Sequence, residues 1–391
     1  MHKQRSIFLL ITAEVAAMAL WFVSAAIVGD MRLEAPISTA MQAALSASVQ
    51  AGFVLGAVAS ALLGLADRFD PRRVFAAAAL FAALANLALL VVPVGDCGAV
   101  VARTATGICL AGVYPVGMKI AVGWGIKDRG LLVGLLVGGV TLGSAAPHLL
   151  AFLGGAEWRS TVIAASALAC IASVIVLFVQ LGPHHARAPR FTPSDTFIAW
   201  TDRRIRRAFG GYLGHMWELY AMWAWIGTAA AVSYSASMTS PAASTLAKVT
   251  AFTAIGAGAI ACAVAGWCAD RIGKAEMTIV VMAASGCCAL LTAATFGGPP
   301  WLTFVVIVAW GITIIPDSAQ FSALVADYSP PDKAGSLMTL QTALGFALTT
   351  ATVQLTPIFA DAYGWPTVIA LLALGPAFGI ASMWTLRRPA Q

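Results

Sequence analysis

Hydrophobic residues run along the chain in long stretches, and short polar segments separate them. A helix that spans a bilayer needs about 20 mostly apolar residues. Division of the sequence at its charge clusters and at Gly and Pro gives twelve such stretches. They cover residues 7–29, 42–64, 73–94, 97–122, 130–153, 160–181, 209–232, 246–268, 276–296, 300–325, 335–360 and 366–385. The pattern predicts an all-α membrane protein with twelve transmembrane helices.

One connection is longer than the others and divides the stretches six plus six. It covers residues 182–208 and contains three prolines and six arginines. We therefore expect an N-terminal six-helix bundle over 1–181, a linker over 182–208 and a C-terminal six-helix bundle over 209–391. The first stretch follows Lys3 and Arg5 as in a signal peptide, but it is too long and contains Glu14, so it is predicted to be a retained span.

Composition excludes a water-soluble globule, because 60% of the 391 residues are hydrophobic and only 10% are charged. If the N-terminus is cytoplasmic, 18 of the 23 Lys and Arg residues fall on the cytoplasmic side and three on the opposite side. This asymmetry predicts a multi-pass protein of the cytoplasmic (inner) membrane with both termini and the linker in the cytoplasm. The basic residues are scattered rather than gathered on one face, so nucleic-acid binding is not expected.

Chemical motifs are scarce. The seven cysteines lie mostly within apolar stretches and lack the spacing of a metal site, so they are interpreted as packing residues and no metal is expected. The chain has no nucleotide-binding loop, nucleophile elbow or metal-hydrolase string. We therefore expect no enzyme activity and no cofactor. The expected partners are the lipid bilayer, a small-molecule substrate and protons, and the expected state is a monomer.

An internal repeat relates the two halves. The string E-x-x-A-M-x-x-W occurs at 14–21 and again at 218–225, an offset of 204, and Pro115, the string ADR at 66–68 and the string TVIA at 161–164 recur at similar offsets. Because six spans return the chain to its starting side, the halves are predicted to be parallel repeats around a central cavity. The residues expected to line this cavity are Met18, Trp21, Tyr114, Met222 and Trp225.

Three segments resemble a known family. The loop at 64–73 resembles the G-x-x-x-D-R-x-G-R-R loop of the major facilitator superfamily, with Asp70 in place of a glycine, and 266–274 is a weaker copy. Arg103-x-x-x-Gly107 resembles the family's R-x-x-x-G segment. The resemblance covers essentially the whole chain and implies the family's two-bundle transporter fold, with a proton-relay role for Arg103. It also implies gating loops that contain Asp67, Arg68, Arg72, Arg73, Asp270 and Arg271.

Few charged residues lie within the predicted spans. A charge at bilayer depth costs about 2.5–3.5 kcal/mol on insertion scales, so such a residue usually faces a pathway or a partner. At 1.5 Å per residue, Glu218 and Asp317 lie at similar heights in the second half, and if they converge they could form a proton carrier. The long side chain of Lys119 could reach Glu14 in the first half. Arg103 and His148 have comparable heights near the other end. These pathway residues are Glu14, Arg103, Lys119, His148, His215, Glu218 and Asp317.

These residues favour a proton-coupled secondary transporter of a small polar or anionic solute, in which Arg103 and Lys119 would hold an anion. Three alternatives remain open. The carboxylates and several tryptophans, including Trp217 and Trp223, could serve the efflux of amphipathic cations. His215, Met216 and Met222 could bind copper(I) in an importer. The same scaffold could also form a receptor that binds ligand without transporting it.

Overall fold

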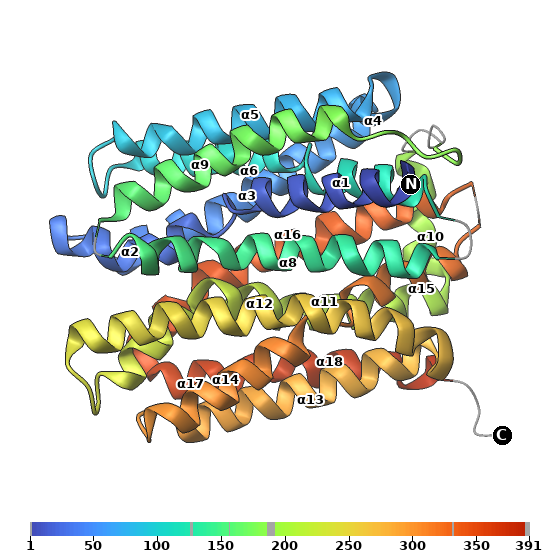
Figure 1. Ribbon diagram of the computed structural model, residues 1–391. Coiled ribbons are helices and arrows are strands. Elements are labelled where there is room, and N and C mark those ends of the chain that lie inside the picture. The colour runs from blue at the N-terminus through green and yellow to red at the C-terminus, as the bar shows by residue number, and fades with distance from the viewer. Residues whose placement is uncertain (1, 126–127, 156, 186–191, 331, 388–391) are drawn as a thin grey trace.

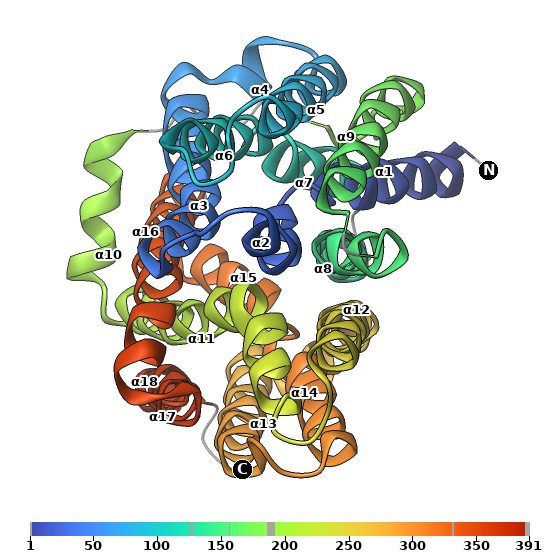
Figure 2. The same cartoon turned by 90° about the vertical axis from the view of Figure 1, so that its left-hand side faces the viewer.

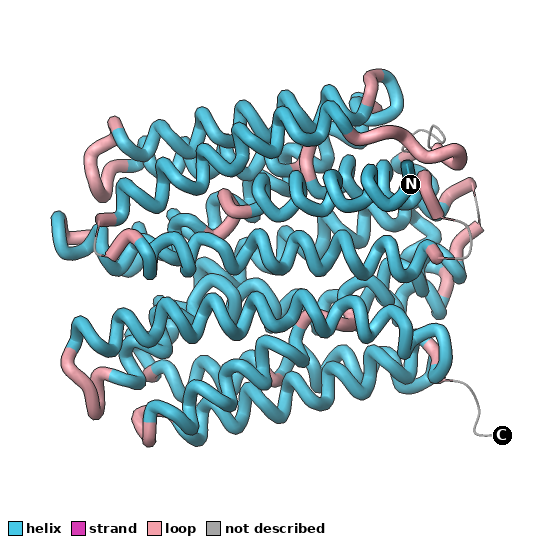
Figure 3. Tube along the Cα trace, in the orientation of Figure 1, coloured by secondary structure: helices cyan, strands magenta, loops and turns pink. Residues whose placement is uncertain are grey.

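The computed structural model describes residues 2–125, 128–155, 157–185, 192–330 and 332–387, and for Ala66, Asp67, Arg129 and Asp270 it describes the backbone alone. The described residues form helices and connections without any strand (Figures 1 and 3). The chain before the linker forms α1 (His2–Met18), α2 (Val23–Glu34), α3 (Thr39–Leu63), α4 (Leu65–Arg68), α5 (Pro71–Leu87), α6 (Cys97–Leu110), α7 (Tyr114–Val122), α8 (Arg129–Leu153) and α9 (Trp158–Ile175), with 3₁₀ turns η1 (Ala88–Leu90) and η2 (Val176–Phe178).

The rest of the chain continues the helical pattern. It forms η3 (Pro193–Phe197), α10 (Ile198–Thr201), α11 (Arg203–Tyr234), α12 (Ser240–Ile272), α13 (Lys274–Thr295), α14 (Pro300–Ile314), α15 (Ser318–Tyr328), α16 (Ala334–Tyr363), α17 (Trp365–Leu372), α18 (Leu374–Met383) and η4 (Trp384–Leu386). Helix α11 begins six residues before the predicted span at 209, because Asp202 caps its first turn by accepting hydrogen bonds from the backbone N–H groups of Arg204 and Ile205.

The helices form two groups that lie side by side (Figure 2). Helices α1–α9 make up the first half and α11–α18 the second, and the short helix α10 lies on the outside between them. The halves meet mainly where α3 packs against α16 and where α8 packs against α12. The start of α1 and the end of the last described helix lie at the same end of the molecule (Figure 1), which we call the terminal end; the other is the far end.

Eleven helical stretches among the described residues are long and apolar enough to cross a membrane. Helix α11 has 32 residues but is not among them, because its tryptophans, tyrosines, His215 and Glu218 make it less apolar. It runs alongside the others within the second half (Figure 2), which is consistent with the twelve expected segments.

Several of the predicted spans are broken near the middle of their length. The first, expected as one helix over 7–29, ends as α1 at Met18 and resumes as α2 at Val23. The fourth and tenth spans break between α6 and α7 and between α14 and α15. Pro115 lies in the first turn of α7, and Pro316 lies in the second break. The helix breaks at these places because proline lacks the N–H that an uninterrupted helix needs. The repeated proline therefore marks a repeated break.

Helices α3 and α6 touch backbone to backbone. A Cβ atom on Gly52 would lie 2.1 Å from the carbonyl oxygen of Thr104, and one on Gly107 would lie 2.1 Å from that of Val49. Only glycine permits this approach, which is typical of membrane helices that associate through small residues. It positions Phe53, the residue after Gly52, against Phe346 of the second half.

Candidate functional site

Aromatic rings from both halves meet at the level of the break between α1 and α2. The ring centroid of Phe53 lies 4.9 Å from that of Trp21 and 4.5 Å from that of Phe346 on α16. Tyr220 on α11 lies 5.9 Å from Trp21 and 5.0 Å from Phe346, and Phe22 lies 5.9 Å from Trp223. We call these six residues the aromatic cluster. Because its rings come from both halves and contact one another, the cluster closes the space between the halves at this level.

Polar atoms within and beside the aromatic cluster lack partners. The indole nitrogens of Trp21 and Trp223 are buried and have no hydrogen-bond partner among the described residues. The same holds for both side-chain amide atoms of Gln50, which lies three residues before Phe53 on the same face of α3. A buried N–H group without a partner is costly unless it binds something in another state. The cluster therefore combines flat apolar faces with unused donors.

Arg103 holds the helix break from which Trp21 and Phe22 project. Its side chain is fully buried, and one guanidinium nitrogen donates to the carbonyl oxygens of Leu20 and Trp21, both at 2.8 Å. The other terminal nitrogen donates to Oδ1 of Asn86 at 2.7 Å, while Nε has no partner among the described residues. A cation at the carbonyl end of a helix is favourable for the helix dipole. Arg103 thus positions the first-half part of the aromatic cluster.

Glu14 is fully buried, and neither of its carboxylate oxygens has a hydrogen-bond partner within the described part of the chain. The carboxylate lies against α7, where a Cβ atom on Gly117 would come within 2.4 Å of Oε2. The sequence led us to expect contact with Lys119. That residue is half-buried, and no hydrogen bond joins it to Glu14. A buried acid without a partner marks a place where a proton or a cation can bind.

Glu218, the repeat-related acid, has a different environment. Ser285 on α13 donates to Oε2 at 2.9 Å, and the indole nitrogen of Trp310 on α14 donates to Oε1 at 2.7 Å. The carboxylate therefore points into the second half and has two donors, whereas Glu14 has none. The repeated motif places the two acids equivalently on their helices but does not give them equivalent partners.

His215 and Asp317 form the buried pair of the second half. Nδ1 of His215 lies 3.0 Å from Oδ1 of Asp317, and each side chain is 1% exposed. Asp317 lies in the break between α14 and α15, and Phe321 and Tyr212 surround the imidazole. Nε2 of His215 has no partner among the residues that the structure describes. The sequence places Asp317 and Glu218 at similar heights, and in the structure Asp317 lies beside His215, one turn before Glu218 on α11.

An ion pair that sequence reasoning missed joins the halves at the far end. Nζ of Lys248 on α12 lies 2.8 Å from Oδ2 of Asp30 on α2, and these side chains are 14% and 7% exposed. Lys248 also donates to the carbonyl oxygens of Ala151 and Gly155, at 3.3 and 2.9 Å. One feature of the sequence could have identified this pair. Lys248 lies near the start of the span predicted at 246–268, on the side where only three Lys and Arg residues are predicted. Thr39 on α3 adds a hydrogen bond to Asp361 on α16.

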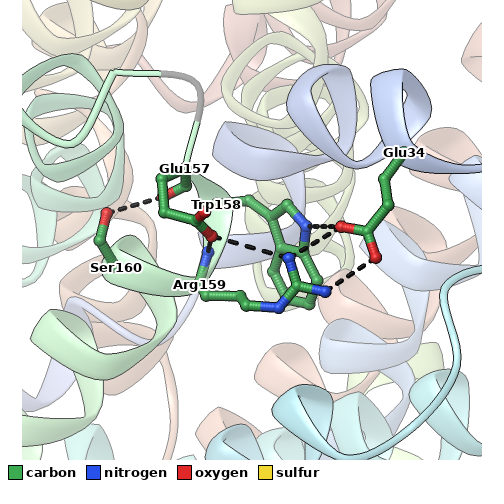
Figure 4. A network of polar contacts seen from close by, with 5 residues as sticks. All are labelled: Glu34, Glu157, Trp158, Arg159 and Ser160. Atoms are coloured by element: carbon green, nitrogen blue, oxygen red, sulfur yellow. Dashed lines mark hydrogen bonds and ion pairs between the residues drawn. The ribbon is translucent and has the colours of Figure 1, made fainter.

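Helix α2 is also fixed to its own half at this end (Figure 4). Arg159 donates to both oxygens of Glu34, at 2.8 and 2.7 Å, and the indole nitrogen of Trp158 donates to Glu34 at 3.0 Å. A paired guanidinium and carboxylate of this geometry is both strong and directional. Helix α2 is therefore attached both within the first half and, through Asp30, to the second.

The other expected lining residues occupy varied places. Met18 packs against Gly143 on α8, His148 lies beside Gly227 on α11, and Tyr114 is half-buried at the start of α7. Met222 and Trp225 line a small cavity inside the second half, next to Trp310 and Trp365, and the Trp225 indole donates to the carbonyl oxygen of Val353. Met222 and Trp225 thus face the interior of their own half rather than the aromatic cluster.

The predicted gating loops differ in their backbone. Gly273 in the second copy has φ of 102°, which favours glycine, but Asp70 at the corresponding place in the first has φ of −60° and caps α5. A guanidinium nitrogen of Arg72 lies 2.6 Å from Oδ2 of Asp70, and the hydrogen bond from Arg72 lowers the pKa of Asp70. Arg72 also donates to the carbonyl oxygen of Val179. Arg68 and Arg73 are exposed, and Arg271 stacks on Trp267. The side chains of Asp67 and Asp270 lie outside the described residues.

Comparison with known proteins gives one family and several structural relatives. The profile of the Major Facilitator Superfamily matches residues 9–349. A structure of the nucleoside transporter NupG (D323A mutant) superposes with a TM-score of 0.73 at 15% identity, covering 98% of this chain and all of that one. The xylose transporter XylE from E. coli, in a partially occluded inward-open conformation, gives 0.77 at 10% identity with complete coverage of both chains. A D-xylose-proton symporter gives 0.77 at 12%, covering 99% and 98%. No curated protein sequence matches the chain.

Proposed function

The chain belongs to the Major Facilitator Superfamily, and from that premise we propose that it is a proton-coupled symporter of a small polar solute in the cytoplasmic (inner) membrane. The terminal end and the linker face the cytoplasm in this proposal, in agreement with the distribution of Lys and Arg. Residues 1–181 and 209–391 act as the two moving bundles, and 182–208 connects them. The far end, which the Lys248–Asp30 pair closes, then faces outward.

The proton site in this proposal is the His215–Asp317 pair, and it is the observation that carries the proposal. The two side chains are 3.0 Å apart and almost wholly buried, and the histidine keeps one ring nitrogen without a partner. An imidazole next to a carboxylate can take up and release a proton at that free nitrogen. The pair also joins α11 to the break between α14 and α15, so a change in its charge acts on an interrupted helix of the second half.

The aromatic cluster supports an uncharged polar solute rather than an anion. Its rings offer flat apolar faces, and its unused indole donors and the amide of Gln50 suit hydroxyl or carbonyl groups. The expected anion site depended on Arg103 and Lys119, but the terminal nitrogens of Arg103 donate to Asn86 and to the break between α1 and α2. The similar structures are a nucleoside transporter and two xylose transporters, whose solutes belong to the same class.

A panel of solutes tests the choice of substrate. Pentoses, hexoses, nucleosides, carboxylates, organic cations and copper(I) are added to the purified protein, and the thermal unfolding temperature is measured, because a selective binder stabilises the fold by mass action. We expect stabilisation by a neutral polar solute, and a Trp223→Ala variant should lose it. Stabilisation by carboxylates alone would refute the neutral class.

Variants of the proton site test the coupling. In proteoliposomes, Asp317→Asn and His215→Gln should abolish uptake that a pH gradient drives, while exchange of labelled for unlabelled solute continues. Asp327→Asn is the matched control, since this acid pairs with Lys274 near the surface of the same half. Gradient-driven uptake that survives both substitutions would refute the assignment.

The second candidate is proton-driven efflux of amphipathic cations, which the unpaired carboxylate of Glu14 favours. Of the four tryptophans considered for cation binding, only Trp21 and Trp223 lie in the aromatic cluster, whereas Trp217 and Trp225 donate to carbonyl oxygens of α17 and α16. Loss of organic-cation binding in a Glu14→Gln variant, with no neutral binder found, would support this candidate over the first.

A further inference from the structure

A cavity outside the space between the halves lies at the terminal end of the second half. Its volume is about 520 Å³, and it opens where α10, the first turns of α11, α16 and α18 meet. Helix α10 lies on the outside of the molecule in Figure 2, away from the contact between α8 and α12. The cavity is therefore open to the surroundings of the protein rather than to the proposed pathway.

One end of the cavity is cationic. Arg203, Arg206 and Arg207 line it, and among the described residues no acidic side chain does. Arg206 donates to the carbonyl oxygen of Trp200 at 2.7 Å, and Arg207 donates more weakly to that of Ser382 at 3.4 Å. Each guanidinium carries five N–H donors, so these contacts orient the side chains and leave donors for a ligand. Three guanidinium groups around one opening suit a phosphate.

The acid next to these arginines in the sequence does not line the cavity. Asp202 precedes the arginines, but its carboxylate accepts hydrogen bonds from the backbone N–H groups at the start of α11. It therefore caps the helix and does not line the cavity.

The other end of the cavity is apolar and extends along the membrane-facing side. Phe209 and Leu213 on α11, Leu344 on α16 and Phe378 on α18 form its walls. Leu213 follows Arg203 by ten residues, which is about 15 Å along a helix. Phe378 is 59% exposed, so this wall faces the hydrocarbon of a bilayer. A free phosphate would use only the cationic end of this shape.

We propose that this cavity binds an anionic phospholipid of the cytoplasmic leaflet. Arg203, Arg206 and Arg207 hold its phosphate, and an acyl chain lies along Phe378 and Leu213. Trp200 on α10 is 56% exposed beside this cavity, and tryptophan is enriched where a protein meets the membrane interface. The lipid fixes α10, and with it the end of the linker, to the second half.

Native mass spectrometry of the full chain in detergent tests this proposal, with phosphatidylglycerol, phosphatidylcholine and inorganic phosphate as separate probes. We expect the protein to retain one phosphatidylglycerol in preference to phosphatidylcholine and to show no comparable binding of inorganic phosphate. An arginine near an anionic surface changes affinity roughly fivefold, so the double variant Arg206→Gln, Arg207→Gln should weaken phosphatidylglycerol binding about 25-fold.

A second cavity variant and a control variant test whether the loss of binding is specific to this cavity. Arg203→Gln alone should weaken binding roughly fivefold, and it removes none of the hydrogen bonds that Arg206 and Arg207 make to backbone carbonyls. Arg5→Gln changes an exposed arginine at the same end of the other half and should leave binding unchanged. Equal retention of phosphatidylcholine, equal binding of inorganic phosphate, or unchanged binding in both cavity variants would each overturn the proposal.

Discussion

Removal of the Asp30 carboxylate should open the far end of the protein. The pair with Lys248 joins α2 to α12, and its side chains are only 7% and 14% exposed. Breaking a buried ion pair from one side costs about 3–5 kcal/mol. Lys248 would keep two carbonyl acceptors, Ala151 and Gly155, so we take about 2 kcal/mol for Asp30→Asn. A shift of that size changes the ratio of closed to open molecules about 30-fold.

Spin labels on either side of the contact measure this change. Leu33 on α2 and Ser237 after α11 are both exposed, and they belong to different halves. With the exposed Cys97 and Cys287 replaced by serine, labels at Leu33→Cys and Ser237→Cys give the distance between the halves by double electron–electron resonance. We expect Asp30→Asn to add or enlarge a long-distance population.

A matched control separates opening from general loosening of α2. Glu34→Gln breaks the ion pair with Arg159 at the same end, but that pair lies within the first half. Its distance distribution should remain that of the parent protein. The reasoning is refuted if Asp30→Asn leaves the distribution unchanged, or if Glu34→Gln changes it as much.

Three further substitutions test contacts that hold the helices in place. Arg103→Lys should lower stability by about 2–4 kcal/mol, because an ammonium cannot reproduce the guanidinium bonds to Asn86 and the α1–α2 break; a small change in thermal unfolding would contradict this. Gly107→Val should cost about 1–3 kcal/mol by forcing α6 from α3, seen as an unfolding temperature below that of the parent. Asp70 is stabilised by Arg72, which lowers its pKa. The stability that Asp70→Asn removes should therefore be constant above the ordinary pKa of about 3.9 and disappear as pH falls through the lowered value; a loss that grows on acidification would refute the pairing.

The sequence predicted the helical architecture well because one physical requirement dominates it. Each span must be long and apolar, and that requirement can be read from single residues. The breaks at Pro115 and Pro316 also follow from a local property, the missing N–H of proline. The break at residues 19–22 contains no proline. It depends on Arg103 of another helix, α6, which donates hydrogen bonds to the freed carbonyl oxygens of Leu20 and Trp21.

The site was predicted as a set of residues rather than as a set of contacts. Intramembrane charge identified His215 and Asp317, but height along a helix could not tell which neighbour each side chain faces, so the pair of Asp317 with His215 was missed. The contact of Lys248 with Asp30 joins residues 218 positions apart and depends on how the halves meet. The repeat suggested similar roles for Glu14 and Glu218, but only Glu218 has hydrogen-bond donors among the described residues, Ser285 and Trp310.

The proposed symport is tested most directly by following protons and solute together. Proteoliposomes that contain a pH-sensitive dye receive the solute identified by the stabilisation panel, without an imposed gradient. We predict that entry of the solute acidifies the interior, and that Asp317→Asn removes the acidification. Solute entry with no change in internal pH, or with alkalinisation, would contradict the account.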